Sequence, residues 1–117
     1  MNKKEIIQTI RVNPRAYEEI RRGDKTVDVR TNTHRYRHLD PGVMVNFYQH
    51  GSFLRMTIDK IVVYESLESL LEDIPFSLLN SEVSSDKETI EHYRSIGYTE
   101  EKVKKHGLLA IFVRLIE

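Results

Sequence analysis

The sequence contains no cysteine and has only three prolines and five glycines among its 117 residues. The absence of cysteine excludes a disulfide framework, a thiolate zinc site and a cysteine nucleophile. The longest apolar run, 108–113, is far shorter than the roughly 20 residues that a membrane helix needs. No signal-peptide core follows the first residues. We therefore expect one domain, residues 1–117, in a reducing cytoplasmic compartment and without a membrane partner.

The chain has no net charge, because 18 basic residues balance 18 acidic ones. Two of its segments nevertheless carry net charges of opposite sign. Segment 21–38 holds six Lys or Arg against two acids, a net charge of +4, and segment 65–101 holds ten acids against two bases, a net charge of −8. The basic segment suits an anion such as phosphate. The alternative is that both segments are ordinary solvated surfaces.

Hydrophobic periodicity and capping residues predict the order of the elements. Asn13 and Pro14 open a helix that Gly23 ends, and Pro75 stops a second helix. The expected strands are 6–12, 25–30, 43–47, 54–58, 61–64 and 109–115. The expected helices are 14–22, 67–74, one that the capping box of Ser85 and Glu88 opens, and a short last helix that Thr99 caps and that ends at Gly107. Because no regular crossover helices separate the strands, the pattern predicts an α+β fold with a small mixed or antiparallel β-barrel flanked by helices.

Several familiar chemistries have no motif in this chain. It has no phosphate-binding glycine loop, no Gly-x-Ser-x-Gly elbow and no His-Glu-x-x-His. His34 and His38 are four residues apart and could chelate a metal only from a helix, which nothing in their segment predicts. We expect neither a metal nor another cofactor.

The stretch Gly23-x-Lys25-x-x-Asp28-x-Arg30 carries the strongest candidate site. Arg30 could hold a phosphate or carboxylate in a bidentate fork. Lys25 could anchor phosphate, or act as a base if burial lowers its pKa. Asp28 and Arg30 share a strand face, which Lys25 joins only if the chain bends after Gly23. The alternative is a charge ladder on a solvated strand.

This stretch resembles the Gly-x-Lys-x-x-Glu-x-Arg signature of the ASCH (activating signal cointegrator homology) domains, within the PUA-like superfamily. The resemblance continues through "PGVMVNF", "IDKIVVYESLESLLEDI" and "HYRSIGYTEEKVKKHGLLAIFVRL", so it spans nearly the whole chain. It implies a small β-barrel with a cleft beside the signature strand, in which members of the family bind RNA or nucleotides. Some members are amidohydrolases that deacetylate N4-acetylcytidine, and ribonuclease activity is also described in the family.

Only some of the catalytic residues of the family's amidohydrolases have a counterpart in this sequence. Lys25 matches the family's catalytic lysine, whereas Asp28 occupies the position of a threonine and cannot supply a hydroxyl. Glu68 and Glu72 are candidates for a distant catalytic glutamate. The resemblance therefore implies catalytic roles for Lys25 and Asp28, and ligand binding by these two residues and Arg30.

Aromatic residues extend the candidate binding surface. Arg35, Tyr36 and Arg37 place one aromatic ring between two cations, a pattern suited to RNA bases and phosphates, although a flexible polar loop explains it equally well. Tyr93 and Tyr98 resemble the C-terminal aromatic positions of the family. Tyr93 could stack on a base or belong to the core.

Three functions follow as hypotheses. The first is a binding module for RNA or for a nucleotide or modified nucleoside, with no DNA expected. The second is a hydrolase acting on N4-acylated cytidine or on an RNA phosphodiester. The third is a regulatory protein-interaction domain that would dock a basic partner on the acidic segment 65–101. The sequence leaves the oligomeric state open.

Overall fold

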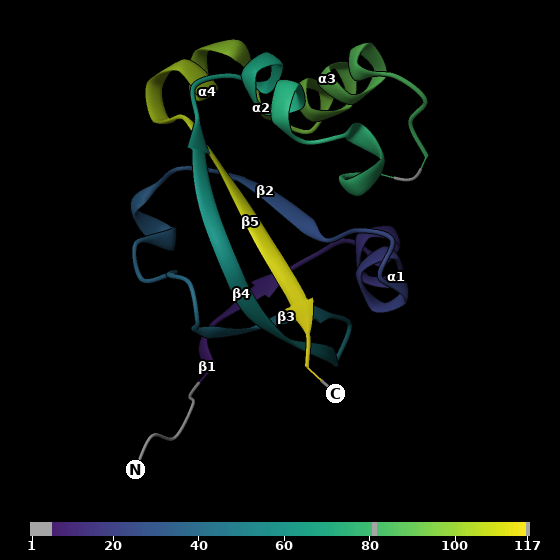
Figure 1. Ribbon diagram of the computed structural model, residues 1–117, viewed down its shortest axis with the longest axis vertical. Helices are drawn as coiled ribbons and strands as arrows, with labels where there is room; N and C mark the ends of the chain where they lie inside the picture. The colour runs from purple at the N-terminus through teal and green to yellow at the C-terminus, as the bar shows by residue number, and fades with distance from the viewer. Residues whose placement is uncertain (1–5, 81, 117) are drawn as a thin grey trace.

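A computed structural model describes residues 6–80 and 82–116 of the chain. One five-stranded sheet curls into a half-barrel, with helices around it (Figure 1). The elements in chain order are β1 (Ile6–Arg11), α1 (Pro14–Arg22), β2 (Val27–Thr31), the 3-10 helix η1 (His34–Tyr36), β3 (Met44–Gln49), β4 (Ser52–Tyr64), α2 (Leu67–Asp73), the 3-10 helix η2 (Phe76–Leu78), α3 (Asp86–Ser95), α4 (Glu100–His106) and β5 (Leu108–Leu115).

The strand order across the sheet is β1-β3-β4-β5-β2. Only the pair of β1 and β3 is parallel, and the other three pairs are antiparallel. The sheet is therefore mixed, and the predicted α+β class with a small curled sheet flanked by helices is confirmed. Among the described residues, no helix is long and apolar enough to cross a membrane.

The long strand β4 covers both segments that the sequence predicts as strands, 54–58 and 61–64. Its pairing with β5 shifts register between Ile58 and Lys60. A bulge of this kind bends a strand and changes which side chains face the core. The bend explains why the alternation of apolar residues in the sequence changes phase near Asp59.

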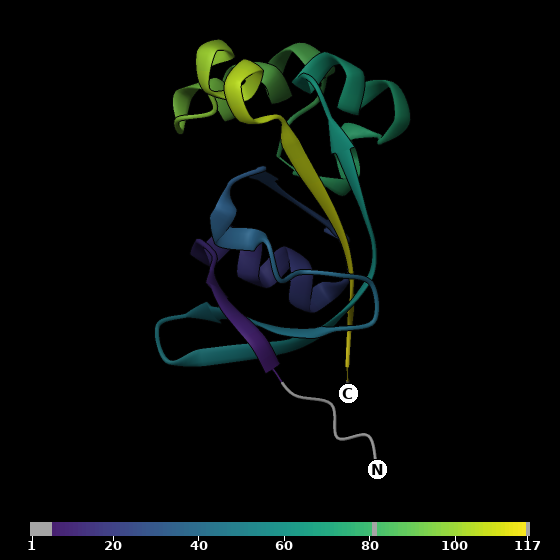
Figure 2. The same ribbon diagram turned by 90° about the vertical axis from the view of Figure 1, so that its left-hand side faces the viewer.

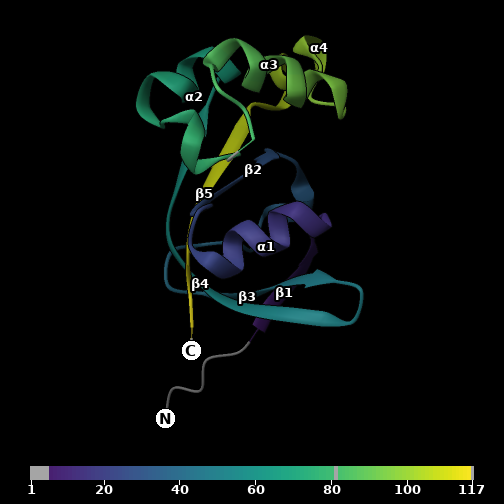
Figure 3. The same ribbon diagram turned by 90° about the vertical axis from the view of Figure 1, so that its right-hand side faces the viewer.

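Two clusters of buried residues lie on either side of the curved sheet. One cluster includes Ile10, Phe47 and Ile111 and packs beneath α1 (Figure 3). The other cluster includes Leu70, Tyr93 and Leu108 and lies under the layer of α2, α3 and α4, which gather at one end of β4 and β5 (Figures 1 and 2). Strand β2 contributes Val27 and Val29 to this second cluster. Helix α1 contributes Ile20 to the first cluster. The two clusters therefore adjoin where α1 and β2 meet the helical layer.

Helix α1 begins and ends as the sequence predicts. The Asn13 side chain accepts a hydrogen bond from the Ala16 backbone N–H, and Pro14 occupies the first helical turn, where its missing N–H costs nothing. Gly23 ends the helix in the left-handed conformation, with φ of 85° and ψ of 7°. Both ends of α1 are therefore fixed by local interactions, which holds its inner face against the candidate site.

Candidate ligand-binding site

The turn after α1 directs Lys25 into the protein. The backbone N–H groups of Asp24 and Lys25 both donate to the Glu19 carbonyl oxygen, at 2.8 and 3.1 Å. Strand β2 begins only at Val27, so Lys25 precedes the regular strand rather than opening it as the sequence predicts. Because the chain bends here, Lys25 can share an environment with Asp28 and Arg30, which was the condition for a common site.

Lys25 is buried, with 7% of its surface exposed. Its Nζ donates a hydrogen bond to the Leu79 carbonyl oxygen at 2.8 Å. Burial lowers the pKa of the Lys25 ammonium, while the carboxylates of Asp28 and Glu19 oppose this effect by favouring the charged form. The lysine therefore lies between two carboxylates in a site that has little contact with water.

Asp28 and Arg30 form a partly buried ion pair on one face of β2. Arg30 Nε lies 2.6 Å from Asp28 Oδ2, and Arg30 Nη2 lies 3.4 Å from Asp28 Oδ1. Arg30 Nη2 also donates to the Arg11 carbonyl oxygen at 3.2 Å, which ties β2 to the end of β1. Burial opposes the charge on Arg30, but attraction to Asp28 outweighs it and raises the pKa of the guanidinium. Asp28 is thus a hydrogen-bond acceptor and not a substitute for a hydroxyl.

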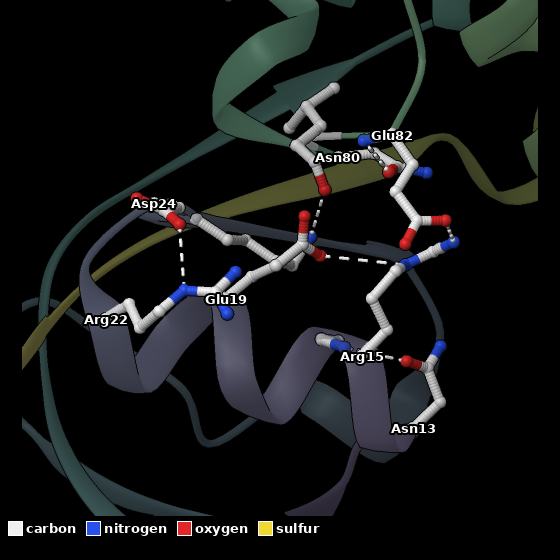
Figure 4. A network of polar contacts seen from close by, with 10 residues as sticks. Asn13, Arg15, Glu19, Arg22, Asp24, Asn80 and Glu82 are labelled. Atoms are coloured by element: carbon white, nitrogen blue, oxygen red, sulfur yellow. Dashed lines mark hydrogen bonds and ion pairs between the residues drawn. The ribbon is translucent and has the colours of Figure 1, made fainter.

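Helix α1 adds two charged residues that the sequence analysis did not assign to the site, Arg15 and Glu19. Figure 4 shows Arg15 between the two carboxylates of Glu19 and Glu82, with Asn80 alongside. Arg15 Nε lies 3.7 Å from Glu19 Oε1, and Arg15 Nη1 lies 2.9 Å from Glu82 Oε1. Glu19 is 2% exposed. The four-residue spacing of Arg15 and Glu19 on a helix was the available signal for this pair.

Asn80 completes the segment that faces α1. Its side-chain Oδ1 accepts a hydrogen bond from the Glu82 backbone N–H at 2.8 Å. Lys25 holds the preceding carbonyl, that of Leu79. The segment that carries Leu79, Asn80 and Glu82 is therefore attached to α1 and to the turn after it by side-chain interactions.

Two tyrosines form the aromatic part of the site. The rings of Tyr93 and Tyr98 meet edge to face, with centroids 5.2 Å apart. The Tyr98 hydroxyl donates to the Val29 carbonyl oxygen at 2.8 Å. Burial raises the pKa of Tyr98 to about 12 and also raises the pKa of Tyr93. Both hydroxyls therefore stay protonated at neutral pH, so each can donate a hydrogen bond.

His92 precedes Tyr93 on α3 and also faces this region. Burial lowers the pKa of its imidazole, and the positive charges of Arg15 and Lys25 lower it further, while Glu82 opposes them. The helical, charged context of His92 in the sequence predicts an ordinary surface histidine instead. No motif could have identified it, because its neighbours come from α1 and from the segment around residue 80.

These residues surround a cavity of about 140 Å³, which we call the Lys25 cavity. Its walls come from α1, β2, the segment around residue 80 and the end of α3. Its charged lining residues are Arg11, Arg15, Glu19, Lys25, Asp28 and Arg30. Tyr93, Tyr98 and His92 also line it. Four of the residues predicted for ligand binding, Lys25, Asp28, Arg30 and Tyr93, therefore meet in one cavity.

The remaining predicted residues do not line this cavity, although the Tyr36 hydroxyl lies close enough to Arg30 and Tyr98 to influence the pKa of both groups. Tyr36 is 9% exposed and belongs to the core, where its ring packs against the cluster beneath α1. Arg35 lies 5.8 Å from the centroid of that ring, and Arg37 Nη1 donates to the His34 carbonyl oxygen. None of the three lines the Lys25 cavity. The ring of Tyr36 is therefore placed to pack in the core rather than to stack on a base at the surface.

The candidates for a distant glutamate are also outside the cavity. Glu68 lies on α2 and pairs with Arg94 at 3.3 Å, and Glu72 is exposed on the same helix. The carboxylates that influence Lys25 are those of Asp28 and Glu19. Among the residues described, no group of three or more His, Asp or Glu is arranged to hold a metal ion.

Comparison with known proteins identifies the fold but no activity. No protein-family model matches the chain, and no curated protein matches it. The crystal structure of hypothetical protein PH0355 is similar, with a TM-score of 0.84 and 28% identity over 93% of this chain and 98% of that one. The solution NMR structure of protein PF0455 from Pyrococcus furiosus has a TM-score of 0.78 and 28% identity over 95% and 99%. The architecture described above is therefore shared over nearly the full length of these two proteins.

Proposed function

We propose that this chain is an ASCH-type domain that binds a cytosine nucleoside or nucleotide in the Lys25 cavity. The observation that carries the proposal is the convergence of Lys25, Asp28 and Arg30 on one cavity, walled by Tyr93 and Tyr98. Buried charges of both signs beside an enclosed space are typical of sites that recognise a polar ligand. The half-barrel with flanking helices agrees with the fold that the ASCH resemblance implies.

The size of the cavity favours a single ring over a longer nucleic acid. An enclosed space of about 150 Å³ holds one benzene molecule. The 140 Å³ of the Lys25 cavity therefore suits one six-membered ring, while a sugar and any phosphate would remain outside. A pyrimidine base meets this condition, whereas a segment of RNA duplex does not.

The side chains in the cavity favour cytosine over uracil. Carboxylates accept hydrogen bonds from the exocyclic amino group of cytosine, and cations donate to its ring carbonyl. Glu19 and Asp28 supply the carboxylates, and Lys25 and Arg30 supply the donors. Uracil has a second carbonyl where cytosine has the amino group. That carbonyl oxygen and the carboxylate are both acceptors, so they could not form a hydrogen bond.

Calorimetric titration with cytidine and uridine tests the proposal. We expect cytidine to bind more tightly than uridine, and Arg30→Lys to weaken cytidine binding about tenfold, because a lysine cannot reproduce the guanidinium fork. Arg114→Lys is the matched control, since it alters an exposed pair with Asp59 outside the cavity. NMR spectra of both variants establish that they are folded. Absence of cytidine binding, or equal weakening by the two substitutions, would contradict the proposal.

A second candidate function is hydrolysis of an N4-acylated cytidine. The lowered pKa of buried Lys25 favours this function, because a neutral amine can take a proton from water. Water would then add to the acyl carbonyl carbon, and the carbon–nitrogen bond would break. The proton taken by Lys25 would pass to the departing amino nitrogen, which leaves acetate and cytidine as products. Asp28, already paired with Arg30, would orient Lys25 rather than attack the substrate.

Incubation with N4-acetylcytidine and chromatography of the products tests this second function. Equal amounts of cytidine and acetate are expected from the unmodified protein, at a rate that increases with pH as Lys25 loses its proton. Lys25→Met should abolish the reaction, whereas Lys104→Met, on exposed α4, should leave it unchanged. Turnover that survives Lys25→Met would show that Lys25 is not the base.

A further inference from the structure

A second pocket adjoins the Lys25 cavity and contains no acidic residue. This pocket has a volume of about 230 Å³, and we call it the Arg11 pocket. Its lining residues are Arg11, Val12, Asn13, Pro14, Tyr48, Gln49 and His50. Arg11, Val12 and Asn13 line both spaces, so the two are neighbours with a common wall.

The backbone explains why the two spaces adjoin. The Arg11 carbonyl oxygen accepts a hydrogen bond from Arg30, which lines the Lys25 cavity. On the neighbouring strand, Tyr48 is the register partner of Arg11, and its carbonyl oxygen accepts a hydrogen bond from the Val12 N–H at 3.0 Å. The end of β1 is therefore fixed to the Lys25 cavity by β2 and to the Arg11 pocket by β3.

A tight turn places His50 at the Arg11 pocket. Gln49 pairs with Ser52 across the hairpin of β3 and β4, so His50 and Gly51 form a two-residue turn. Both residues have positive φ, 45° for His50 and 79° for Gly51, as a type I′ turn requires. A histidine in this conformation is uncommon. The side chain of His50 is thereby carried on a short, well-defined turn beside the end of β1.

The polar groups of the Arg11 pocket are suited to an anion. Among the described residues, neither Arg11 nor His50 has a side-chain hydrogen bond or an ion pair with another residue. This contrasts with Arg30 and Arg15, which are both paired with carboxylates. An arginine fork binds phosphate in a bidentate manner, and an imidazole can donate a hydrogen bond to a phosphate oxygen. A cation without a protein counter-charge is therefore available next to the cavity.

We propose that the Arg11 pocket is a phosphate subsite, with Arg11 and His50 as the binding residues, and that the ligand of the Lys25 cavity is a nucleotide rather than a free nucleoside. The inference rests on the proposed function, because it takes the base to occupy the Lys25 cavity. The sugar then bridges the shared wall at Arg11–Asn13, and the phosphate lies in the Arg11 pocket. The arrangement places the charged part of the ligand where the protein has no acid to repel it.

Calorimetric titrations with cytidine, cytidine 5′-monophosphate and cytidine 3′-monophosphate test the subsite. One of the two monophosphates should bind about tenfold or more tightly than cytidine, since a hydrogen bond to a charged group contributes on this scale. Arg11→Ala should remove this advantage, and it should weaken monophosphate binding at least about tenfold more than cytidine binding, which it can also affect because Arg11 lines both spaces. Arg55→Ala is the matched control, because Arg55 is exposed on β4 and lines neither space.

The outcomes separate this inference from the proposed function. If cytidine binds but neither monophosphate binds more tightly, or if the advantage survives Arg11→Ala, the subsite is wrong and the Lys25 cavity stands. If neither cytidine nor either monophosphate binds, the proposed function and the subsite both fail. His50→Ala should reduce the advantage only in part, because the arginine fork supplies most of the contacts.

Discussion

The buried charges of the site depend on one another. Asp28 is buried beside two cations, since it pairs with the partly buried Arg30 and also favours the charged form of the buried Lys25. Removal of one member of a buried pair leaves an uncompensated charge, which costs far more than the pair contributes. Among the charged residues of the site, we therefore expect substitution of Asp28 to lower the free energy of unfolding most.

Asp28→Asn should lower the free energy of unfolding by about 3–5 kcal/mol, because the buried Lys25 would lose a nearby carboxylate and the partly buried Arg30 would lose its counter-charge. Urea denaturation followed by circular dichroism measures the change. Asp59→Asn provides the comparison, since Asp59 pairs with Arg114 at an exposed position. That substitution should cost less than about 1 kcal/mol. Equal effects of the two substitutions would mean that the Asp28 pair is not buried in solution.

His92 should give the protein a stability that depends on pH in the mildly acidic range. Its folded-state pKa lies below the ordinary value of 6.5, so the unfolded chain holds the proton more tightly. Stability therefore falls as the pH decreases from 6.5 to the folded-state pKa. Thermal melts between pH 7 and 5 should show a smaller loss for His92→Gln than for the unmodified protein. His38→Gln, on an exposed segment, should not reduce the loss.

The individual residues of the site were only partly predictable. Lys25, Asp28 and Arg30 lie within six positions of one another and carry a recognisable signature. Glu19 and His92 could not be assigned, because they approach Lys25 only when α1 and α3 pack around the end of β2. Tyr36 was predicted at a binding surface, but its apolar ring fills the core beneath α1. A short polar context does not reveal whether an aromatic ring in it points inward.

Helix α1 and the turn that follows it determine the direction of Lys25. The left-handed conformation of Gly23 lets two successive backbone N–H groups return to the Glu19 carbonyl oxygen. An added Cβ at Gly23 would meet no atom within 4 Å, so its cost is purely conformational. The sequence shows that Lys25 can join Asp28 and Arg30 only if the chain bends after Gly23. Whether the chain bends there depends on how α1 packs, which the sequence does not reveal.

Gly23→Ala should lower the free energy of unfolding by about 1–2 kcal/mol, the usual cost of the left-handed conformation for a residue with a Cβ. Gly23→Asn should cost less, since asparagine adopts this conformation more readily. Chemical denaturation of the two variants measures the difference. A larger loss for asparagine than for alanine would mean that the space around residue 23 matters rather than its backbone conformation.

The elements themselves were largely predictable, because caps and periodicity act locally. The four helices were all expected, and Ser85 and Thr99 cap α3 and α4 with their side chains. The bulge in β4 and the parallel pairing of β1 with β3 were not, since both depend on contacts between distant segments. The bulge bends β4, and the curl of the sheet brings the end of β1 to β2, where Arg30 donates to the Arg11 carbonyl oxygen.

The acidic residues of segment 65–101 gather at one end of the molecule. The acidic segment 65–101 forms α2, α3 and the start of α4, which lie together at one end of the molecule (Figure 1). The net charge of the chain is zero. A long polyanion that followed the cavity mouth toward these helices would meet like charges. The molecule is therefore better suited to a mononucleotide than to an extended strand.

A short single-stranded oligocytidine should bind with a weak dependence on salt. If only the Arg11 pocket neutralises a phosphate, the slope of log K against log salt should be near −0.7. Fluorescence anisotropy at several salt concentrations measures this slope. A slope steeper than about −3 would indicate several phosphate contacts. Such a result would favour an extended RNA-binding surface over the cavity.

The most direct test of the central claim is NMR chemical-shift mapping of the backbone amides during titration with cytidine. Binding in the Lys25 cavity should shift the amides of Lys25–Thr31, of Asn80 and of Tyr93–Tyr98, and leave those of α2 (Leu67–Asp73), which contributes no residue to the cavity, unchanged. Shifts confined to α2, or no shifts at all, would contradict the assignment of the Lys25 cavity as the ligand-binding site.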